Sequence, residues 1–416
     1  MEFAYSDKVE GLRGQIQDFM DAHIVPRIQN WRREVHAGIY PVSFMEELKT
    51  TARQQGLWNL FLPGLKPEEP GTPLTNLEYA PLAEIMGRVN WASEAFNCSA
   101  PDTGNMELLH MFSSPEQYEQ WLAPLLNGEI RSAFAMTEPD TASSDASNIQ
   151  TRIKRDGDDY VINGRKWWIT NAAHPNCQLL IVMGKTDPSA DAYHQQSMVL
   201  VPMKTPGVRV VRNLTVVNHH HPEGHCEIIF DHVRVPKNHL LGEEGSGFAL
   251  AQARLGPGRI HHCMRSIGAA ELALALMTAR AQQRQTFGRY LHEHGSVAEW
   301  ISRSRIEIEQ ARLLVLKTAW LIDEKGTKAA RKEISMIKAL VPMLHTTVLD
   351  RAMQTFGAMG VSPDTPLADH WTWGRALRYA DGPDEVHHRA VARMEVKESG
   401  DYLSMMGAYL TPYEPD

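Results

Sequence analysis

The sequence has few cysteines, and none of them is spaced as a disulfide framework or a zinc site would require. Its 416 residues include four cysteines, which are far apart and form no CxxC pair: Cys98, Cys177, Cys226 and Cys263. Disulfide-rich domains and structural zinc sites both use cysteines at short, repeated spacings. We therefore expect no disulfide framework, no zinc site and a reducing compartment.

A histidine cluster does not change this expectation. His219, His220 and His221 are contiguous, and His225 follows. The run lacks the i,i+4 or paired spacing by which side chains converge on one metal ion. We predict a surface loop or the edge of a pocket here, and no bound metal.

The chain also lacks long apolar runs and basic clusters. No apolar stretch approaches the ~18–20 residues of a membrane-spanning helix. The net charge is -8, whereas general binding to nucleic acid needs a basic face. Residues 1–8 are unlike a signal or transit peptide. We expect a soluble cytoplasmic protein with no membrane insertion and no nucleic-acid partner.

Three sections follow one another along the chain. Residues 1–130 carry apolar residues at helical spacing and predict an N-terminal all-α domain. Residues 131–237 contain short β-type runs and predict a middle β domain. Residues 238–416 return to helical periodicity and predict a C-terminal α-helical bundle. The fold class is therefore α+β, and several domains suit a chain longer than the roughly 250–300 residues of one core.

An aromatic segment in the β section has a pattern suited to a flat cofactor. Tyr160 to Ile162 and Lys166 to Thr170 flank Asn163-Gly164, which predicts a hairpin with Asn-Gly in its turn. Strand alternation would bring Trp168 and Thr170 to one face. An indole beside a hydroxyl could hold and tune a redox ring. A buried aromatic strand is the alternative interpretation.

Small hydroxyl residues precede this segment. Met136-Thr137-Glu138-Pro139 leaves the first β run, and Ser143-Ser144-Asp145 follows. Backbone N–H and hydroxyl groups in such a loop could bond the polar edge of a cofactor. Ser, Thr and Asp are also common in ordinary turns, which is the alternative.

Two later motifs are suited to phosphate or adenine. Arg284 to Gly288 ends a helical stretch with a guanidinium and an aromatic ring, which suit a pyrophosphate and a stacked base. Gln354 to Gly360 contains glycines that let a backbone approach a nucleotide closely. Each motif alone could be a simple helix end.

A lone carboxylate lies on a turn near the end of the chain. Asp381 precedes Gly382-Pro383, so its side chain can project into a cavity as a general base. The alternative is an N-cap for the following helix. Asp384 or Glu385 would be the better cap, which leaves Asp381 free for chemistry.

In this order, the motifs resemble those of the acyl-CoA dehydrogenase family over essentially the whole chain. The resemblance rests on the Thr-Glu-Pro and Ser-Asp segment, Trp168-Ile169-Thr170, Val233-Arg234-Val235-Pro236, the glycine-rich Gly242 to Phe248, and the two later motifs. It implies a helical domain, a β domain and a C-terminal four-helix bundle. It also implies a homodimer or homotetramer with one FAD per subunit.

The resemblance assigns roles to individual residues. The implied flavin contacts are Met136, Thr137, Ser144, Trp168 and Thr170, and a further FAD contact is Glu385. The implied contacts to a neighbouring subunit's FAD are Arg284, Thr286, Phe287, Gln354 and Gly357. The implied substrate contacts are Ser144, Arg259, Gly382, Asp102 and Asn105. Asp102 and Asn105 are polar for a plain fatty chain, which suggests a hydroxylated or branched acyl group. They could equally cap a helix and face away.

Two departures from the family pattern concern the base and the first loop. Most members have Tyr-Glu-Gly-Thr where this chain has Ala380-Asp381-Gly382-Pro383. Others have a Glu directly before the active-centre arginine, where this chain has Gly258. The first loop has an extra residue and no glycine. These features resemble the subfamily that in animals is fused to a kinase-like domain.

The implied reaction is α,β-dehydrogenation of an acyl-CoA thioester. Asp381 would remove the α-proton, and electrons would pass to an electron-transfer flavoprotein. Asp is one methylene shorter than Glu, and a misplacement near 1 Å can cost about a hundredfold in rate. Two alternatives stay open, an oxidase-like flavoprotein that uses oxygen and a silent acyl-CoA-binding subunit.

Overall fold

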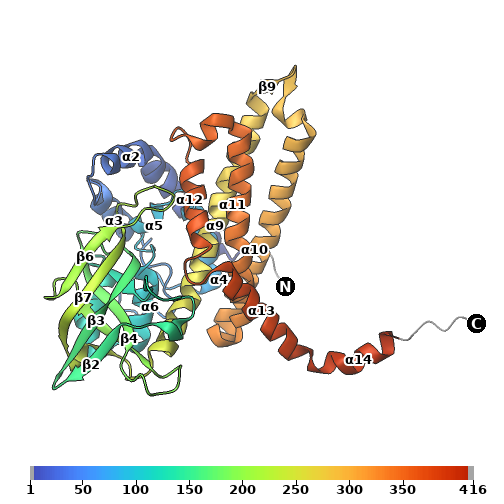
Figure 1. Cartoon of the computed structure of the whole chain (residues 1–416). Coiled ribbons are helices and arrows are strands. Elements are labelled where there is room, and N and C mark those ends of the chain that lie inside the picture. Colours follow the sequence, from blue (N-terminus) through green and yellow to red (C-terminus); the bar gives the residue numbers. More distant parts are fainter. Residues whose placement is uncertain (1–3, 411–416) are drawn as a thin grey trace, which may run out of the picture.

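The computed structural model describes residues 4–410. Along the chain, a β section lies between two helical sections (Figure 1). The N-terminal helices are α1 (Asp7–Phe19), α2 (Ile28–His36), α3 (Met45–Gln54), α4 (Asn76–Met86), α5 (Ala92–Ala95), α6 (Asp102–Phe112), α7 (Pro115–Gln117) and α8 (Ala123–Leu126). The strands of the β section are β1 (Arg131–Ala135), β2 (Arg152–Asp156), β3 (Asp159–Thr170), β4 (Cys177–Lys185), β5 (Gln196–Pro202), β6 (Val208–Asn213), β7 (His225–Pro236) and β8 (Leu240–Leu241). The predicted α, β, α order is confirmed.

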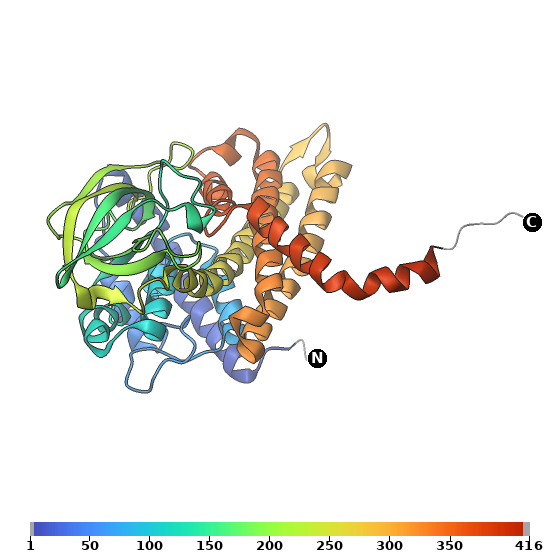
Figure 2. The ribbon, with the colours of Figure 1, turned by 60° about the horizontal axis from the view of Figure 1, so that its bottom comes forward.

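The C-terminal section is built on long helices. Its helices are α9 (Gly247–Gln283), α10 (Gly295–Ala329), α11 (Arg331–Phe356), α12 (Leu367–Leu377), α13 (Asp384–Glu398) and α14 (Tyr402–Tyr409), with the short β9 (Gln285–Thr286) and β10 (Arg289–Tyr290) between α9 and α10. The first three pack side by side, and α14 extends away from the body (Figures 1 and 2). No helix within residues 4–410 is long and apolar enough to cross a membrane.

Local sequence signals set several helix starts. Thr75 accepts a hydrogen bond from the backbone N–H of Glu78 at 3.1 Å, and the Glu78 carboxylate accepts one from Thr75 N–H at 3.0 Å. This capping box satisfies backbone donors that would otherwise lack partners at the start of α4. α4 then packs closely on α9, where a Cβ at Gly268 would lie 1.8 Å from the carbonyl oxygen of Glu84.

The strands form one sheet with the order β6-β7-β3-β2-β4-β5-β8, and β1 pairs in parallel with β4. The apolar residues of one face of the sheet form a separate core that includes Ile162, Leu180 and Val199. A larger core joins the N-terminal helices to α9, α10 and α11. The sheet and the helices are thereby held against each other, with the functional residues at the boundary.

The predicted Asn-Gly hairpin is wrong. β2 and β3 pair up to Asp156 and Asp159, so the turn is at Gly157-Asp158. Asn163 and Gly164 lie inside β3, at a bulge where its pairing with β7 shifts. A Cβ at Gly164 would lie 2.4 Å from Thr151 Oγ1, so this glycine serves close packing and not a turn.

A second bulge changes the aromatic end of β3. The pairing with β7 shifts again between Lys166 and Ile169, and Trp168 has a φ of 55°. The extra residue breaks the simple alternation that we assumed. As a result, Lys166 and Ile169 are both fully buried, whereas Trp168 is 40% exposed.

Candidate active site

A cavity of about 2360 Å³ lies where the β section meets the C-terminal helices. Its walls come from the loop after β1, the end of β3, the start of β7, α9 and the turn between α12 and α13, and the N-terminal section adds residues of α2 and α6. The cavity brings together these predicted site residues: Met136, Thr137, Ser144, Trp168, Thr170, Arg259, Asp381 and Gly382. Sequence positions up to 246 residues apart, such as Met136 and Gly382, therefore share one space.

Asp381 lies on the turn between α12 and α13 with a φ of 55°, which is unusual for a residue other than glycine. The guanidinium of Arg259 donates to the backbone oxygen of Asp381 at 2.9 Å, and His387 Nε2 is 3.3 Å from the same oxygen. These contacts hold the backbone of the turn and leave the carboxylate to face the cavity. Strained residues fixed in this way often belong to functional sites.

Asp381 is not a helix cap. α13 begins at Asp384, its N-cap is Pro383, and no side chain caps it. The Asp384 carboxylate instead accepts a hydrogen bond from Arg378 Nε at 2.6 Å. The cap alternative for Asp381 is therefore removed.

Basic side chains surround the Asp381 carboxylate. Burial alone would raise its pKa, but the contact with the His262 ring and the positive charges of Arg254, Arg259 and Lys338 hold the pKa below its usual value. The carboxylate is accordingly ionised at neutral pH, which is the state that a general base needs.

Gly258 faces the same carboxylate from α9. A Cβ built at Gly258 would lie 3.6 Å from Asp381 Oδ2. A longer side chain at this position would therefore reach the space that Asp381 occupies. The two base positions inferred from the sequence are neighbours in the fold, and only one of them carries an acid here.

The loop after β1 is fixed by a buried ion pair that the sequence did not reveal. Lys166 Nζ donates to the Met136 carbonyl at 2.7 Å and to Glu138 Oε1 at 2.9 Å. Glu138 also accepts from the backbone N–H groups of Gln150 and Thr151, at 2.7 and 2.8 Å. Burial lowers the pKa of Lys166 to about 8, although Glu138 opposes the shift. The pair anchors the cavity-lining Met136 and Thr137.

An aromatic wall stands beside this loop. Thr170 Oγ1 is 3.0 Å from Nδ1 of His225, whose ring stacks on Trp373 at a centroid distance of 6.5 Å. Trp168 is 5.8 Å from the same histidine ring. Burial, with a smaller effect from His221, lowers the pKa of His225 to about 3, so the ring is neutral. His219, His220 and His221 line the cavity edge, as predicted for this loop.

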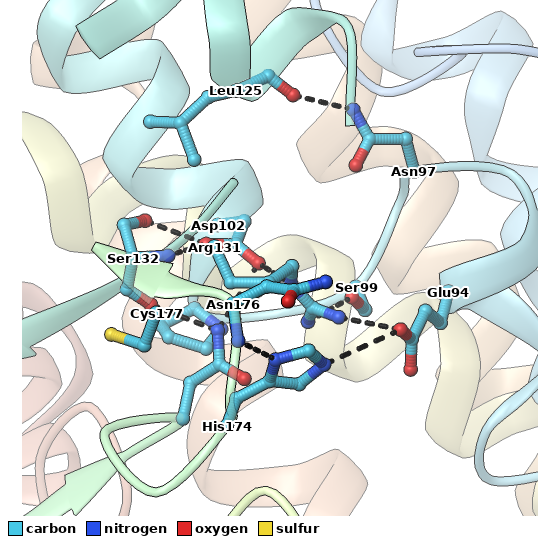
Figure 3. Close-up of polar contacts among 12 residues, drawn as sticks. Glu94, Asn97, Ser99, Asp102, Leu125, Arg131, Ser132, His174, Asn176 and Cys177 are labelled. Atoms are coloured by element: carbon cyan, nitrogen blue, oxygen red, sulfur yellow. Dashed lines mark hydrogen bonds and ion pairs between the residues drawn. The ribbon is translucent and has the colours of Figure 1, made fainter. Parts of the chain in front are cut away.

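Asp102 and Asn105 do not line the cavity. Asp102 forms an ion pair with Arg131 and accepts hydrogen bonds from the backbone N–H and the hydroxyl of Ser132 (Figure 3). Asn105 donates to the Ser132 hydroxyl at 2.9 Å and accepts from Arg254 Nε at 2.8 Å. Arg131 is buried and requires anionic partners, which holds Asp102 against β1, whereas Asn105 is held by Ser132 and Arg254. They therefore give no support to a hydroxylated or branched acyl group.

The residues of the two later motifs lie away from the cavity. Arg284, Thr286 and Phe287 lie at the tip of the bundle around β9, where Phe287 is 95% exposed (Figure 1). Gln354 and Gly357 lie at the end of α11. Glu385, in the first turn of α13, is also absent from the cavity wall. Among residues 4–410, none of these six residues is part of the cavity lining.

Comparisons with known proteins agree with this architecture. The chain matches the acyl-CoA dehydrogenase N-terminal domain over residues 6–129, the middle domain over 133–233 and the C-terminal domain over 245–395. It is 57% identical to the protein named probable acyl-CoA dehydrogenase FadE2 of Mycobacterium tuberculosis, with 95% of this chain and 97% of that protein covered. The chain belongs to the acyl-CoA dehydrogenase family.

Longer relatives of this acyl-CoA dehydrogenase family member occur in animals. It is 53% identical to acyl-CoA dehydrogenase family member 10 of Mus musculus, with 94% of this chain covered, and 49% identical to family member 11 of Gallus gallus, with 97% covered. The chain spans only 37% and 52% of those two proteins. It is thus similar to one part of each.

Solved structures show the same fold. A protein of Mycobacterium abscessus assigned to the acyl-CoA dehydrogenases is 47% identical, with a TM-score of 0.92 over 96% of this chain and 100% of that one. Butyryl-CoA dehydrogenase from Megasphaera elsdenii is 27% identical, with a TM-score of 0.82 over 95% and 100%. This family member is an oxidoreductase that acts on acyl-CoA, and its cofactor is FAD.

The cavity offers groups that fit a flavin. Thr137 and Ser144, which carry hydroxyl groups, line the same cavity as Trp168. His225 Nε2 is buried and lacks a hydrogen-bond partner among the described residues. Because buried polar atoms normally have partners, an unpaired nitrogen at the wall of this cavity suits a site that a polar ring system completes.

Proposed function

We propose that this chain desaturates an acyl-CoA thioester between its α and β carbons, with Asp381 as the base. The observation that carries the proposal is the ionised Asp381 carboxylate, which faces the same cavity as Trp168 and Thr170. A base, a ring-binding wall and a hydroxyl loop around one space are the parts that this reaction needs. The base comes from the C-terminal section, and the wall and the loop come from two different parts of the β section.

Roles in cofactor binding follow from position in the cavity. Met136, Thr137 and Ser144 would hold the polar side of the FAD, and Trp168 and Thr170 would border its ring. The bound flavin supplies an acceptor for the β-hydrogen, which leaves as hydride. Lys166 and Glu138 support this arrangement from behind, since they fix the loop that bears Met136 and Thr137.

Asp381 would take the α-proton onto a carboxylate oxygen. The family resemblance implies that the backbone N–H of Asp381 donates to the thioester carbonyl, which makes the α-proton more acidic. A donor of this kind contributes about 3–4 kcal/mol in comparable sites. The same residue would thus supply both the base and one carbonyl donor, with Gly382 giving the turn its freedom.

We also propose that the enzyme works as a homodimer or homotetramer and passes electrons to an electron-transfer flavoprotein. Arg284, Thr286, Phe287, Gln354 and Gly357 do not line the cavity of their own chain, which is expected if they contact FAD in a neighbouring subunit. The exposed Phe287 ring would then stack against a partner's ligand.

Replacement of the base tests the proposal. Asp381→Asn removes the proton acceptor but keeps the size and most of the hydrogen bonding of the side chain. We expect this variant to bind FAD and to lose turnover by at least about a hundredfold. Asp384→Asn is the matched control, because Asp384 is on the same segment but pairs with Arg378. An Asp381→Asn variant with near-native turnover would overturn the assignment.

A further inference from the structure

His262 contacts the carboxylate of the proposed base. It lies on α9, one turn after Gly258, and its side chain is buried. Its Nε2 is 3.4 Å from Asp381 Oδ2. Among residues 4–410, no ion pair joins this carboxylate to Arg254, Arg259 or Lys338. Arg259 instead donates a hydrogen bond to the backbone oxygen of Asp381, and Lys338 donates one to the carbonyl of Leu377.

The hydrogen bonding of His262 determines which nitrogen carries its proton. Nδ1 is 3.2 Å from Arg265 Nη2. A guanidinium can only donate, so Nδ1 must accept, and the single proton of the neutral ring lies on Nε2. Burial lowers the pKa of His262 to about 3, with Asp381 opposing the shift, so the ring stays neutral over the working range. The Nε2–H group is therefore the one donor that the neutral ring can offer to Asp381, and in this structure the two groups are 3.4 Å apart without forming an aligned hydrogen bond.

We propose that His262 is a positioning residue for Asp381, whose Nε2–H group holds one carboxylate oxygen so that the other is directed at the substrate α-carbon. The inference rests on the proposed function. A distance of 3.4 Å is longer than the usual 2.7–3.2 Å of a tight N–H···O bond. Catalytic hydrogen bonds are often long before the substrate binds, and they tighten in the complex.

The contact with His262 would compensate for the shorter reach of an aspartate base. An aspartate reaches less far than a glutamate, so its orientation must be controlled more closely. Trp373 packs edge-on against His262 at a centroid distance of 6.4 Å and restricts the ring. Arg265, itself bound to the Cys98 carbonyl at 3.3 Å, fixes its other side. The base is thus supported from α9, where Gly258 leaves room for it.

The test compares His262→Leu, which removes the donor, with His262→Gln, which keeps an N–H donor. We expect His262→Leu to lower kcat by about tenfold or more, with little change in KM. We expect His262→Gln to recover part of this loss. Loss of the donor also destabilises the ionised carboxylate, so the acid limb of kcat/KM should move to higher pH. The other groups that face Asp381, which are Arg254 and Arg259 on α9, Lys338 on α11 and His387 on α13, stay unchanged.

A neighbouring histidine provides the control. His261 is fully buried between the rings of Phe61 and Tyr79 and does not line the cavity. We expect His261→Gln to lower the thermal midpoint without moving the pH profile. If His262→Leu does not fold, His262→Met, which also lacks the donor, takes its place. Wild-type kcat and pH profile in a folded variant that lacks the donor would overturn this inference, whereas turnover by Asp381→Asn would overturn the proposed function itself.

Discussion

At the scale of single residues, the surroundings of Asp381 keep its carboxylate ionised and also lower its basicity. The cationic groups that keep the carboxylate ionised also make it a weak base in the empty site. An acyl chain that fills the cavity would exclude water from the carboxylate, which raises the pKa of a buried acid toward that of a useful base. Binding of the substrate would in this way raise the basicity of Asp381, which removes the α-proton.

The pH dependence of kcat/KM follows from the free enzyme. The pKa of Asp381 lies below the usual aspartate value, so this base is already deprotonated throughout the range from about pH 8 to about pH 5. We expect no acid limb from Asp381 within that range in the wild-type enzyme. Steady-state kinetics with a saturating electron acceptor would measure kcat/KM across this pH range. An acid limb centred near pH 6 that disappears in a charge-neutral Asp381 variant would contradict the assigned environment.

The sequence predicted the backbone position of Asp381, because a glycine and a proline follow it, and the structure has this residue on a turn at the cavity. Its role as the base stays a prediction. Asp102 and Asn105 could not be assigned correctly, because their partners Arg131, Ser132 and Arg254 are distant in sequence and their meeting depends on the packing of α6 against β1 and α9. His262 gave no signal, since a histidine on a helix acquires its role only from what packs against it.

At the scale of elements, β3 determines the shape of the cofactor side of the cavity. Its two bulges turn Trp168 outward and place Lys166 inside, under the loop after β1. The Asn-Gly pair predicted a turn because this dipeptide suits tight hairpins. In the fold, close contact with Thr151 requires the glycine, and such a contact cannot be read from neighbouring residues.

Loss of the buried pair under the loop should affect both stability and cofactor binding. Lys166→Met leaves the Glu138 carboxylate buried without its cation, which typically costs about 3–5 kcal/mol. We expect a lower urea midpoint and a lower FAD content in this variant. Lys154→Met, on the exposed side of β2, is the control and should change neither. Unchanged FAD content in Lys166→Met would show that the pair does not fix the loop.

At the scale of the whole molecule, many histidines are buried and neutral. Burial lowers the pKa of His174, His225, His262 and His345 to about 3 and that of His370 and His387 to about 4. Unfolding would return each to an ordinary value near 6.5. The three-section organisation could be predicted from periodicity alone, but this shared burial could not, because it depends on how the sections pack together.

Stability should therefore fall as the pH decreases. Below about pH 6.5 the unfolded chain binds protons that the folded chain does not, and each such histidine lowers the free energy of unfolding by up to ~1.4 kcal/mol per pH unit. This stability is fully present above about pH 6.5 and is lost as the pH falls toward the folded-state values. Urea unfolding at constant ionic strength should show a much lower midpoint near pH 5 than near pH 7.5. An equal or higher midpoint near pH 5 would contradict the buried neutral state of these rings.

The central claim is that Asp381 initiates reduction of the bound flavin by an acyl-CoA. The most direct measurement is the visible spectrum of the FAD-loaded protein under anaerobic conditions, before and after addition of octanoyl-CoA, for the wild type and Asp381→Asn. We predict bleaching of the flavin band in the wild type and an unbleached band in the variant, with equal FAD content in both. Bleaching of Asp381→Asn at the wild-type rate would contradict the account.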